Sequence, residues 1–413
     1  MKNILKRLSI IALCTVGVVT SLNAQVQEKD NNRFIESGVV PMDKIKGFTL
    51  KTGAGEMLFK PYVLIQAGAD FNYYDDEGLN LADQDNVANS GFAIPNALIG
   101  FSGSSFGILT YNITLNAAQS GGALLQQAWM DINLKDELRF RVGKFKTPFQ
   151  HAYLTTIGQT LFSSVASSVV TPVRTNLSLD AVQPSMYTGF DLGVQMHGVL
   201  KDKFAYQIGV FNGTGIGVNG ATKTTSDDWK GLPSLLYSAR VAYMPHGEMP
   251  THQGDPGDLN SNKMIIAAST SYNVEGQSES SNDFRAGAEF AWIYKKLYIG
   301  AEWYMLNMDW TSRMHNSDNF TSWGAYAQAG YFVSPKVQAA LRYDFFDRNG
   351  VDLDGMLNMP SIGANYFLSS INLKLQVMYQ YIGKWGHTSQ IERDNDDMGM
   401  AYHGAKIQLQ YTF

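Results

Sequence analysis

Apolar and polar residues alternate with a period of two over much of this chain. In residues 371–379, Ile, Leu, Leu, Val and Tyr occupy the odd positions, and Asn, Lys, Gln and Met occupy the even ones. Residues 407–413 repeat the pattern, with Ile, Leu, Tyr and Phe at the odd positions. Such alternation is typical of strands that have one apolar and one polar face.

About sixteen strands of this kind follow one another. Their predicted centres lie near residues 65, 98, 112, 129, 141, 194, 207, 239, 268, 289, 302, 326, 341, 362, 376 and 407. Short turns are expected near Ser104, Asp136, Asp202, Lys295, Ser334 and Ser369. Longer polar loops are expected near Gly78, Thr160, Gly220, His315, Asp352 and Asp394. Only the connection from Pro245 to Asn262 departs from this alternation of short and long connections, because it is long although it falls on the short-turn side.

An even number of strands, with short turns at one end and long loops at the other, is typical of outer-membrane barrels. Beyond the N-terminus no run of about 18 apolar residues would make a transmembrane helix. We therefore predict an all-β transmembrane antiparallel β-barrel of about 16 strands, surrounded by outer-membrane lipids. The alternative is a soluble β-sandwich, which the strand count and the terminal aromatic Phe413 disfavour.

Residues 1–24 have the character of a targeting segment. A basic start at Lys2, Lys6 and Arg7 precedes an apolar run, and Ala24 provides a small residue for cleavage before Gln25. The alternative is a buried N-terminal helix. The prediction is a signal peptide over 1–24, a mostly irregular N-terminal periplasmic extension over 25–58 and the barrel over 59–413. The single cysteine lies within the signal peptide, so the mature chain would have no disulfide.

Charge excludes one class of partner. The full chain has a net charge of −5. Removing residues 1–24 takes away three basic residues, which leaves 29 basic against 37 acidic residues and a net charge of −8. An acidic chain without basic clusters is not expected to bind nucleic acid.

The longest loop, from Gln150 to Tyr187, is rich in Ser, Thr and Val, and Arg174 is its only Lys or Arg. A loop of this length is usually functional. In a barrel, a nearly uncharged loop can fold inward and narrow the lumen. We predict that this third external loop is the constriction loop.

Charged residues in the strands share the polar parity and should face the lumen, since a charge facing lipid is costly. The predicted pore-lining, anion-binding residues are Arg139, Arg141, Arg174, Arg240, Arg285, Arg342, Lys374 and Lys406. The inward carboxylates are Asp70, Asp131, Asp191, Glu289, Glu302 and Asp344. Such charges set ion selectivity when they face water. The alternative is that opposite charges on adjacent strands pair across the wall.

Other motifs have a simpler interpretation. Residues 215–220 match a dinucleotide fingerprint, but a loop follows where the motif requires a helix. Residues 352–355 resemble part of a calcium loop without its downstream Glu. The histidines are scattered; we expect His197 and His403 to face the lumen, without a serine nucleophile near either. We expect no catalytic residues, no metal and no cofactor.

Three blocks together resemble the phosphate-selective porin O and P family. They are Arg-Val-Gly-Lys-Phe-Lys-Thr-Pro-Phe at 141–149, Asp-Leu-Gly-Val-Gln-Met-His-Gly at 191–198 and Tyr-Gln-Ile-Gly-Val-Phe-Asn-Gly-Thr-Gly at 206–215. The resemblance implies a sixteen-stranded barrel, a homotrimer and a third loop folded into the pore. It also implies that inward arginines and loop lysines carry anions. This chain departs from the family's charged loop block, because residues 161–167 read Leu-Phe-Ser-Ser-Val-Ala-Ser.

The predicted function is an outer-membrane porin for passive diffusion of small solutes. The inward arginines favour a weak preference for anions, phosphate among them, and neutral solutes are the other expected cargo. The alternative is a non-conducting or ligand-specific barrel that acts as a receptor, an adhesin or a structural surface protein.

Overall fold

The computed structural model describes the chain from Leu50 onward in segments. These are residues 50–51, 57–74, 87–170, 188–215, 219–220, 223, 227, 230–250, 252–275, 281–310, 320–347, 356–384 and 402–413. The predicted signal peptide lies outside the described residues, as does most of the predicted extension. β1 and the first two residues of β2 fall within the range assigned to that extension.

Strands make up most of the described chain. They are β1 (Leu50–Lys51), β2 (Met57–Tyr74), β3 (Val87–Ser105), β4 (Leu109–Asn116), β5 (Leu125–Lys135), β6 (Leu138–Lys146), β7 (Phe190–Leu200), β8 (Phe204–Phe211), β9 (Leu236–Tyr243), β10 (Asn262–Asn273), β11 (Ser281–Tyr294), β12 (Leu297–Trp310), β13 (Phe320–Ser334), β14 (Val337–Asp347), β15 (Met356–Ser369), β16 (Leu373–Lys384) and β17 (Tyr402–Thr412). The helical turns are short: η2 (Gly121–Leu124), α2 (His151–Leu154), η3 (Ile157–Gln159) and α3 (Ser167–Val170).

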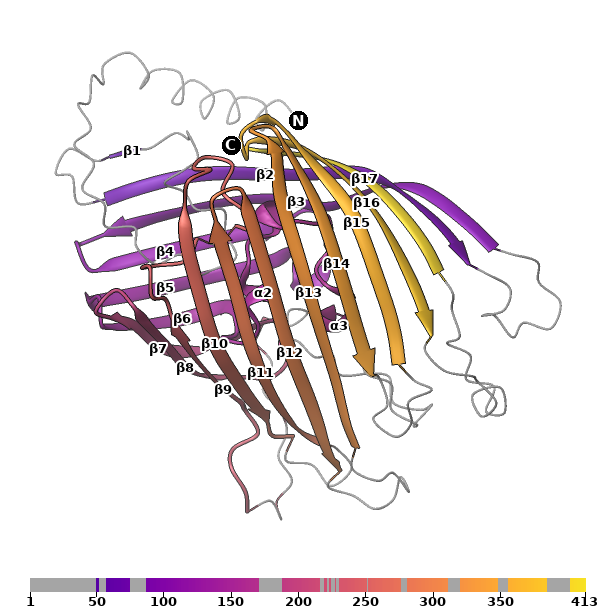
Figure 1. The fold of residues 1–413 in the computed structure, drawn as a ribbon. Coiled ribbons are helices and arrows are strands. Elements are labelled where there is room, and N and C mark those ends of the chain that lie inside the picture. The colour runs from indigo at the N-terminus through magenta and orange to yellow at the C-terminus, as the bar shows by residue number, and fades with distance from the viewer. Residues whose placement is uncertain are drawn as a thin grey trace, which may run out of the picture. The chain divides into compact units, whose positions relative to one another are not determined.

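The sixteen strands from β2 to β17 form a closed antiparallel barrel. Each strand pairs with the next along the chain, and β17 pairs with β2 to close the ring, Thr412 opposite Leu64. Figure 1 shows the long strands running side by side around the wall. Each predicted strand centre lies within one of these sixteen strands, so the predicted fold class is confirmed.

Turn lengths follow the predicted alternation. Two residues connect β11 to β12 and β13 to β14, whereas the connections at the other end of the barrel are longer. Residues 244–261, between β9 and β10, are the long connection at the short-turn end that the sequence indicated.

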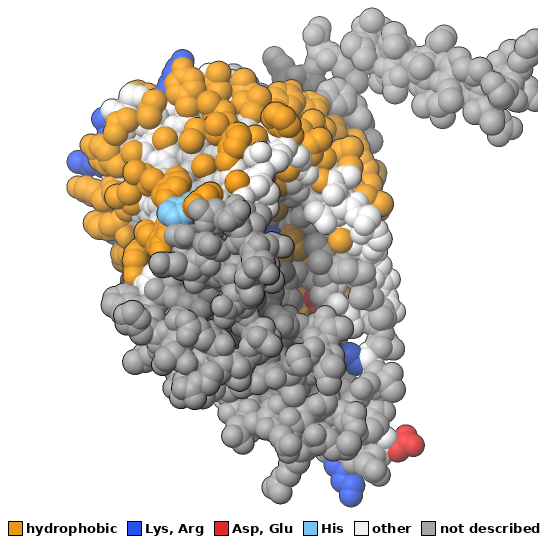
Figure 2. Space-filling model, turned by 90° about the vertical axis from the view of Figure 1, so that its right-hand side faces the viewer, with side chains coloured by type: hydrophobic (Ala, Val, Ile, Leu, Met, Phe, Trp, Pro, Cys, Tyr) orange, Lys and Arg blue, Asp and Glu red, His pale blue; other side chains and the backbone are white. Residues whose placement is uncertain are grey.

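The two faces of the wall differ as the alternation predicts. In β17, Gln408 and Gln410 are fully buried, whereas Ile407 and Leu409 are 44% and 48% exposed. Figure 2 shows the outer wall as a broad hydrophobic surface, with Lys and Arg side chains beyond its upper margin. An apolar outer face suits a bilayer, because the hydrocarbon core has no polar groups that could solvate a charge. Among the described helices, none has the length and hydropathy to cross a bilayer.

Candidate pore lining

Two arginines on β6 lead into the long loop, and both are paired with carboxylates. Arg139 contacts Asp136 at 2.7 Å. Arg141 lies opposite Asp131 in the β5–β6 register and contacts it at 2.8 Å. Asp131 also lies 3.0 Å from Nε2 of His197 on β7. The guanidinium of Arg141 stacks 4.1 Å from the ring centre of Trp129, which adds a cation–π attraction.

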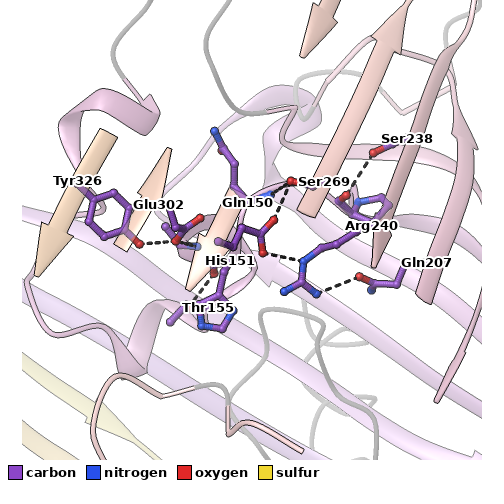
Figure 3. Close-up of polar contacts among 12 residues, drawn as sticks. Gln150, His151, Thr155, Gln207, Ser238, Arg240, Ser269, Glu302 and Tyr326 are labelled. Atoms are coloured by element: carbon purple, nitrogen blue, oxygen red, sulfur yellow. Dashed lines mark hydrogen bonds and ion pairs between the residues drawn. The ribbon is translucent and has the colours of Figure 1, made fainter. Parts of the chain in front are cut away.

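A second buried pair joins β9 to β11. Arg240 Nε donates to Glu289 at 2.8 Å, and the two side chains are 1% and 0% exposed. Arg240 also donates to Gln207 at 3.4 Å, and Ser269 donates to Glu289 at 2.7 Å. Figure 3 shows Gln207, Arg240 and Ser269 in this hydrogen-bonded cluster. Burial of two charges requires such partners, because the desolvation cost is large.

Two more of the predicted cations lie beside carboxylates. Arg285 lies 3.7 Å from Asp283, and Lys406 lies 3.3 Å from Asp70. Lys406 and Asp70 are the more open pair, with side chains 23% and 34% exposed.

Two further cations bind the long loop rather than a carboxylate. Arg342 Nη1 donates to the carbonyl of Ser164 at 3.0 Å and stacks 4.6 Å from the ring centre of Phe162. Lys374 Nζ donates to the carbonyls of Gly158 and Thr160 at 3.1 and 3.3 Å. Cations therefore hold the backbone of this loop against the wall.

Of the eight predicted pore-lining residues, Arg174 lies outside the described residues. Five of the other seven form ion pairs with carboxylates, and two bind loop carbonyls. Two of these pairs, Arg141–Asp131 and Lys406–Asp70, join adjacent strands and match the alternative that opposite charges pair across the wall. The other three pairs lie within one strand, reach a turn or span an intervening strand. A role for these residues in binding anions stays a prediction.

Two of the inward carboxylates also hold the loop. Glu302 accepts a hydrogen bond from the backbone N–H of Ala152 at 2.7 Å and another from the hydroxyl of Tyr326. Figure 3 shows Glu302 and Tyr326 pointing toward one another beside the start of α2. Asp344 accepts from the N–H of Ser168, in α3, at 3.2 Å. These carboxylates satisfy N–H groups that a short helix leaves free.

Neutral amides complete the anchoring, and the sequence analysis missed them. The carbonyls of Gly158, Thr160 and Leu161 accept from side-chain amides. The donors are Gln410 at 2.9 Å, Gln376 at 3.2 Å and Asn365 at 2.9 Å. The Asn and Gln residues that recur at lumen positions of β15 to β17 could have indicated these contacts. An amide can donate a hydrogen bond to a carbonyl without bringing a charge.

The described part of the long loop, residues 150–170, therefore lies against the inward faces of β10, β12 and β14 to β17. Lys146, at the end of β6, donates to the carbonyl of Thr155 at 3.1 Å and holds the loop's first turn. Residues 171–187 lie outside the described residues. That the whole of 150–187 narrows the pore stays a prediction.

Other sequence motifs contribute little to this site. No group of three His, Cys, Asp or Glu within the described segments is placed to hold a metal ion. The acidic loop residues 352–355 and 394–397 lie outside those segments. The expectation for His403 was wrong: it shares the outer face with Tyr379, whose hydroxyl lies 2.7 Å from its Nδ1. The imidazole ring of His403 also lies beside the ring of Tyr381, with 5.0 Å between the ring centres.

Comparison with known proteins agrees with the architecture. The profile described as phosphate-selective porin O and P matches residues 65–413. The chain is similar to the outer membrane channel DcaP of Acinetobacter baumannii, with 10% identity, a TM-score of 0.54 and coverage of 89% of this chain and 100% of that one. It is also similar to the trimer form of in-vitro folded OmpT of Vibrio cholerae, with 12% identity, a TM-score of 0.50 and coverage of 87% and 100%. No match to a curated protein was found.

Structural likeness at such low identity shows the fold alone, whereas the family profile covers most of the chain. Together with the closed barrel it indicates a channel rather than an enzyme, and it places the protein in the outer membrane. The chain belongs to the phosphate-selective porin O and P family.

Proposed function

We propose that this protein is a passive-diffusion porin for small polar solutes, with a weak preference for anions. The observation that supports it best is the closed sixteen-stranded barrel, apolar outside and polar inside, in a chain that belongs to a porin family. A polar inner face supports passage of hydrated solutes.

The preference for anions is weak because five of the seven described cations of the wall are paired with carboxylates. Arg139, Arg141 and Arg240 each contact a carboxylate, so each pair presents little net charge to a passing ion. Fixed charges act over about 8–10 Å at physiological salt, so those beside the narrowest point matter most. Arg342 and Lys374, which bind loop carbonyls, and Arg174, in the predicted constriction loop, are the cations that would bias this point toward anions.

The constriction is the loop over 150–187. Support comes from its described half, which binds inward-facing groups on six strands, β10, β12 and β14 to β17. A loop held by this many partners stays close to the wall and leaves a narrowed passage beside it.

We further propose a homotrimer embedded in outer-membrane lipid. The exposed apolar side chains of the outer wall support contact with acyl chains. The family resemblance supports the trimer, and the OmpT structure to which the chain is similar is described as a trimer form.

A planar-bilayer recording tests the proposal. The purified protein should give stable conductance steps, and a gradient of potassium chloride should give a small reversal potential of the sign for anion preference. Cation selectivity would contradict the assignment, and so would unchanged reversal potential after Arg174→Ala. Block of the chloride current by micromolar phosphate would show a tight phosphate site instead of a weak preference for anions.

One observation favours the second candidate, a non-conducting or ligand-specific barrel. The side chains of Arg240 and Glu289 are almost wholly buried, and the inward-facing Glu302 is only 4% exposed. A wide water-filled channel would wet such groups. The absence of conductance steps from folded, reconstituted protein would favour this candidate.

A further inference from the structure

The connection between β9 and β10, residues 244–261, has a distinctive place in the barrel. Its two ends are tied to neighbouring turns: Met244 N–H donates to the carbonyl of Lys203 at 2.7 Å, and Lys295 N–H donates to that of Ser261 at 2.7 Å. Between these ties, His252, Gln253 and Asp255 are each at most 7% exposed. Polar residues of a surface turn would be hydrated, so this segment is covered by other parts of the protein.

Gln253 contacts the long loop through both its backbone and its side chain. Its N–H donates to the carbonyl of Gln159 at 2.9 Å. Its side-chain oxygen accepts from the N–H of Leu161 at 2.7 Å. The two contacts flank one loop residue, as in a strand pair, and therefore set the position of the loop along the connection.

The wall beneath joins the same two segments. The amide of Gln338, on β14, donates to the carbonyl of Gln253 at 3.1 Å. Asn365, on β15, donates to Gln338 at 3.0 Å and to the carbonyl of Leu161 at 2.9 Å. One pair of wall amides thus holds both the connection and the loop.

The next residue, Gly254, is closely packed. Its φ is +105°, a conformation that favours glycine. A Cβ there would lie 2.3 Å from Nε2 of Gln338 and 3.2 Å from the ring of Phe332. Gly257, in the same connection, is different: a Cβ there would meet only Asp255 Oδ1, at 3.3 Å.

We propose that residues 252–255 are a second pore element, which enters from the short-turn end and positions loop residues 157–161. Gln253 is the positioning residue, and Gly254 permits its close approach to the wall. The constriction is then built from both ends of the barrel, and loosening the connection loosens the loop. This inference rests on the proposed porin function.

A pair of cysteines tests the contact itself. The one native cysteine, Cys14, lies in the predicted signal peptide, so Gln159→Cys with Gln253→Cys adds the only pair to the mature chain. Residues joined by a backbone hydrogen bond lie within the range over which a disulfide closes. Oxidation of the folded protein in membranes should form the crosslink. Failure to form it would overturn the proposal.

Point variants test the positioning. Gln253→Ala and Gly254→Ala should raise single-channel conductance and open-channel noise relative to the parent. In both variants, a cysteine placed at Ser164 should also become reactive toward bulky thiol reagents. The reaction is measured on folded, heat-modifiable protein, so general destabilisation of the wall would not account for it. Gly257→Ala is the matched control and should behave as the parent.

Unchanged conductance and unchanged protection of the Ser164→Cys thiol in both variants would refute the proposal. If the parent conducts no current, the porin function fails, whereas the crosslink and the thiol protection still report on the contact. If a point variant does not fold, the crosslink decides, because Gln253→Cys keeps the backbone hydrogen bond to Gln159.

Discussion

At the scale of single residues, buried ion pairs dominate the inner wall. Asp131 has one guanidinium and one imidazole within hydrogen-bonding distance, and it is 1% exposed. Removing one partner of a buried pair leaves an uncompensated charge, and this is more costly than removing both.

Arg141→Ala should therefore lower the free energy of unfolding by about 3 kcal/mol. The combined change Arg141→Ala with Asp131→Ala should cost less than the single change. Lys406→Ala, which breaks a partly exposed pair, should cost less than about 1 kcal/mol. Denaturant titration of the barrel in lipid vesicles measures all three. An equal loss for Arg141→Ala and Lys406→Ala would show that burial of the first pair does not matter.

Gly143, in the middle of the block at 141–149, is required by close packing of backbones. Its φ is +126°, and a Cβ there would lie 2.2 Å from the carbonyl oxygen of Ala128 on β5. Gly143→Ala should destabilise the barrel by at least about 2 kcal/mol, because strain and a clash coincide. Gly91→Ala, where a Cβ meets nothing within 4 Å, should change stability by less than about 0.5 kcal/mol. The same titration compares them, and similar losses would contradict this account.

At the scale of elements, the described half of the long loop, residues 150–170, is held against the inner wall of the barrel. This half has little regular structure, so its polar backbone groups depend on side chains of the wall. Buried backbone groups need partners. Cations, carboxylates and amides from β12 and β14 to β17 supply them, and they therefore fix where the described half of the loop runs.

This arrangement predicts selective access to the loop. Ser164 is exposed toward the lumen, so Ser164→Cys should react with a small charged thiol reagent, whereas the narrowed passage should exclude a bulky maleimide. Gln119→Cys, at an exposed position in the connection between β4 and β5, should react with both. Gel-shift labelling of intact cells gives the comparison. Equal labelling of both sites by the bulky reagent would show that residue 164 is open to the outside.

At the scale of the whole molecule, the barrel depends on one seam between its first and last strands. Phe413 and Val63 exchange two backbone hydrogen bonds, each 3.1 Å long, at the end of the β17–β2 pairing. A closed barrel has no free edge, so a loosened seam exposes unpaired backbone.

Deleting Phe413 should reduce the yield of folded, heat-modifiable barrel. The deletion removes two hydrogen bonds worth about 1 kcal/mol each, and also the terminal aromatic side chain. Phe413→Tyr keeps both features and should assemble as the parent does. Gel mobility with and without heating measures the folded fraction. Normal yield from the deletion would show that the last residue is dispensable for closure.

The period-two pattern was sufficient to predict the sixteen strands, their order and the two faces of the wall. Alternation is a local property, and the lipid outside and the polar interior impose it on each strand separately. The alternating turn lengths are local too, and by themselves they mark the connection at 244–261 as unusual. The blocks within 141–215 were enough to indicate the family.

Contacts between residues that are far apart in the sequence could be identified only from the closed barrel. Whether Arg342 would meet a carboxylate or the carbonyl of Ser164 depends on how the loop crosses the interior, and no local pattern encodes that path. The same holds for Gln253 and Leu161, which lie far apart in the chain and meet only after sixteen strands set the register of the wall. Strand formation follows from neighbouring residues, whereas the pairing of inner charges and the course of the loop follow from closure of the ring.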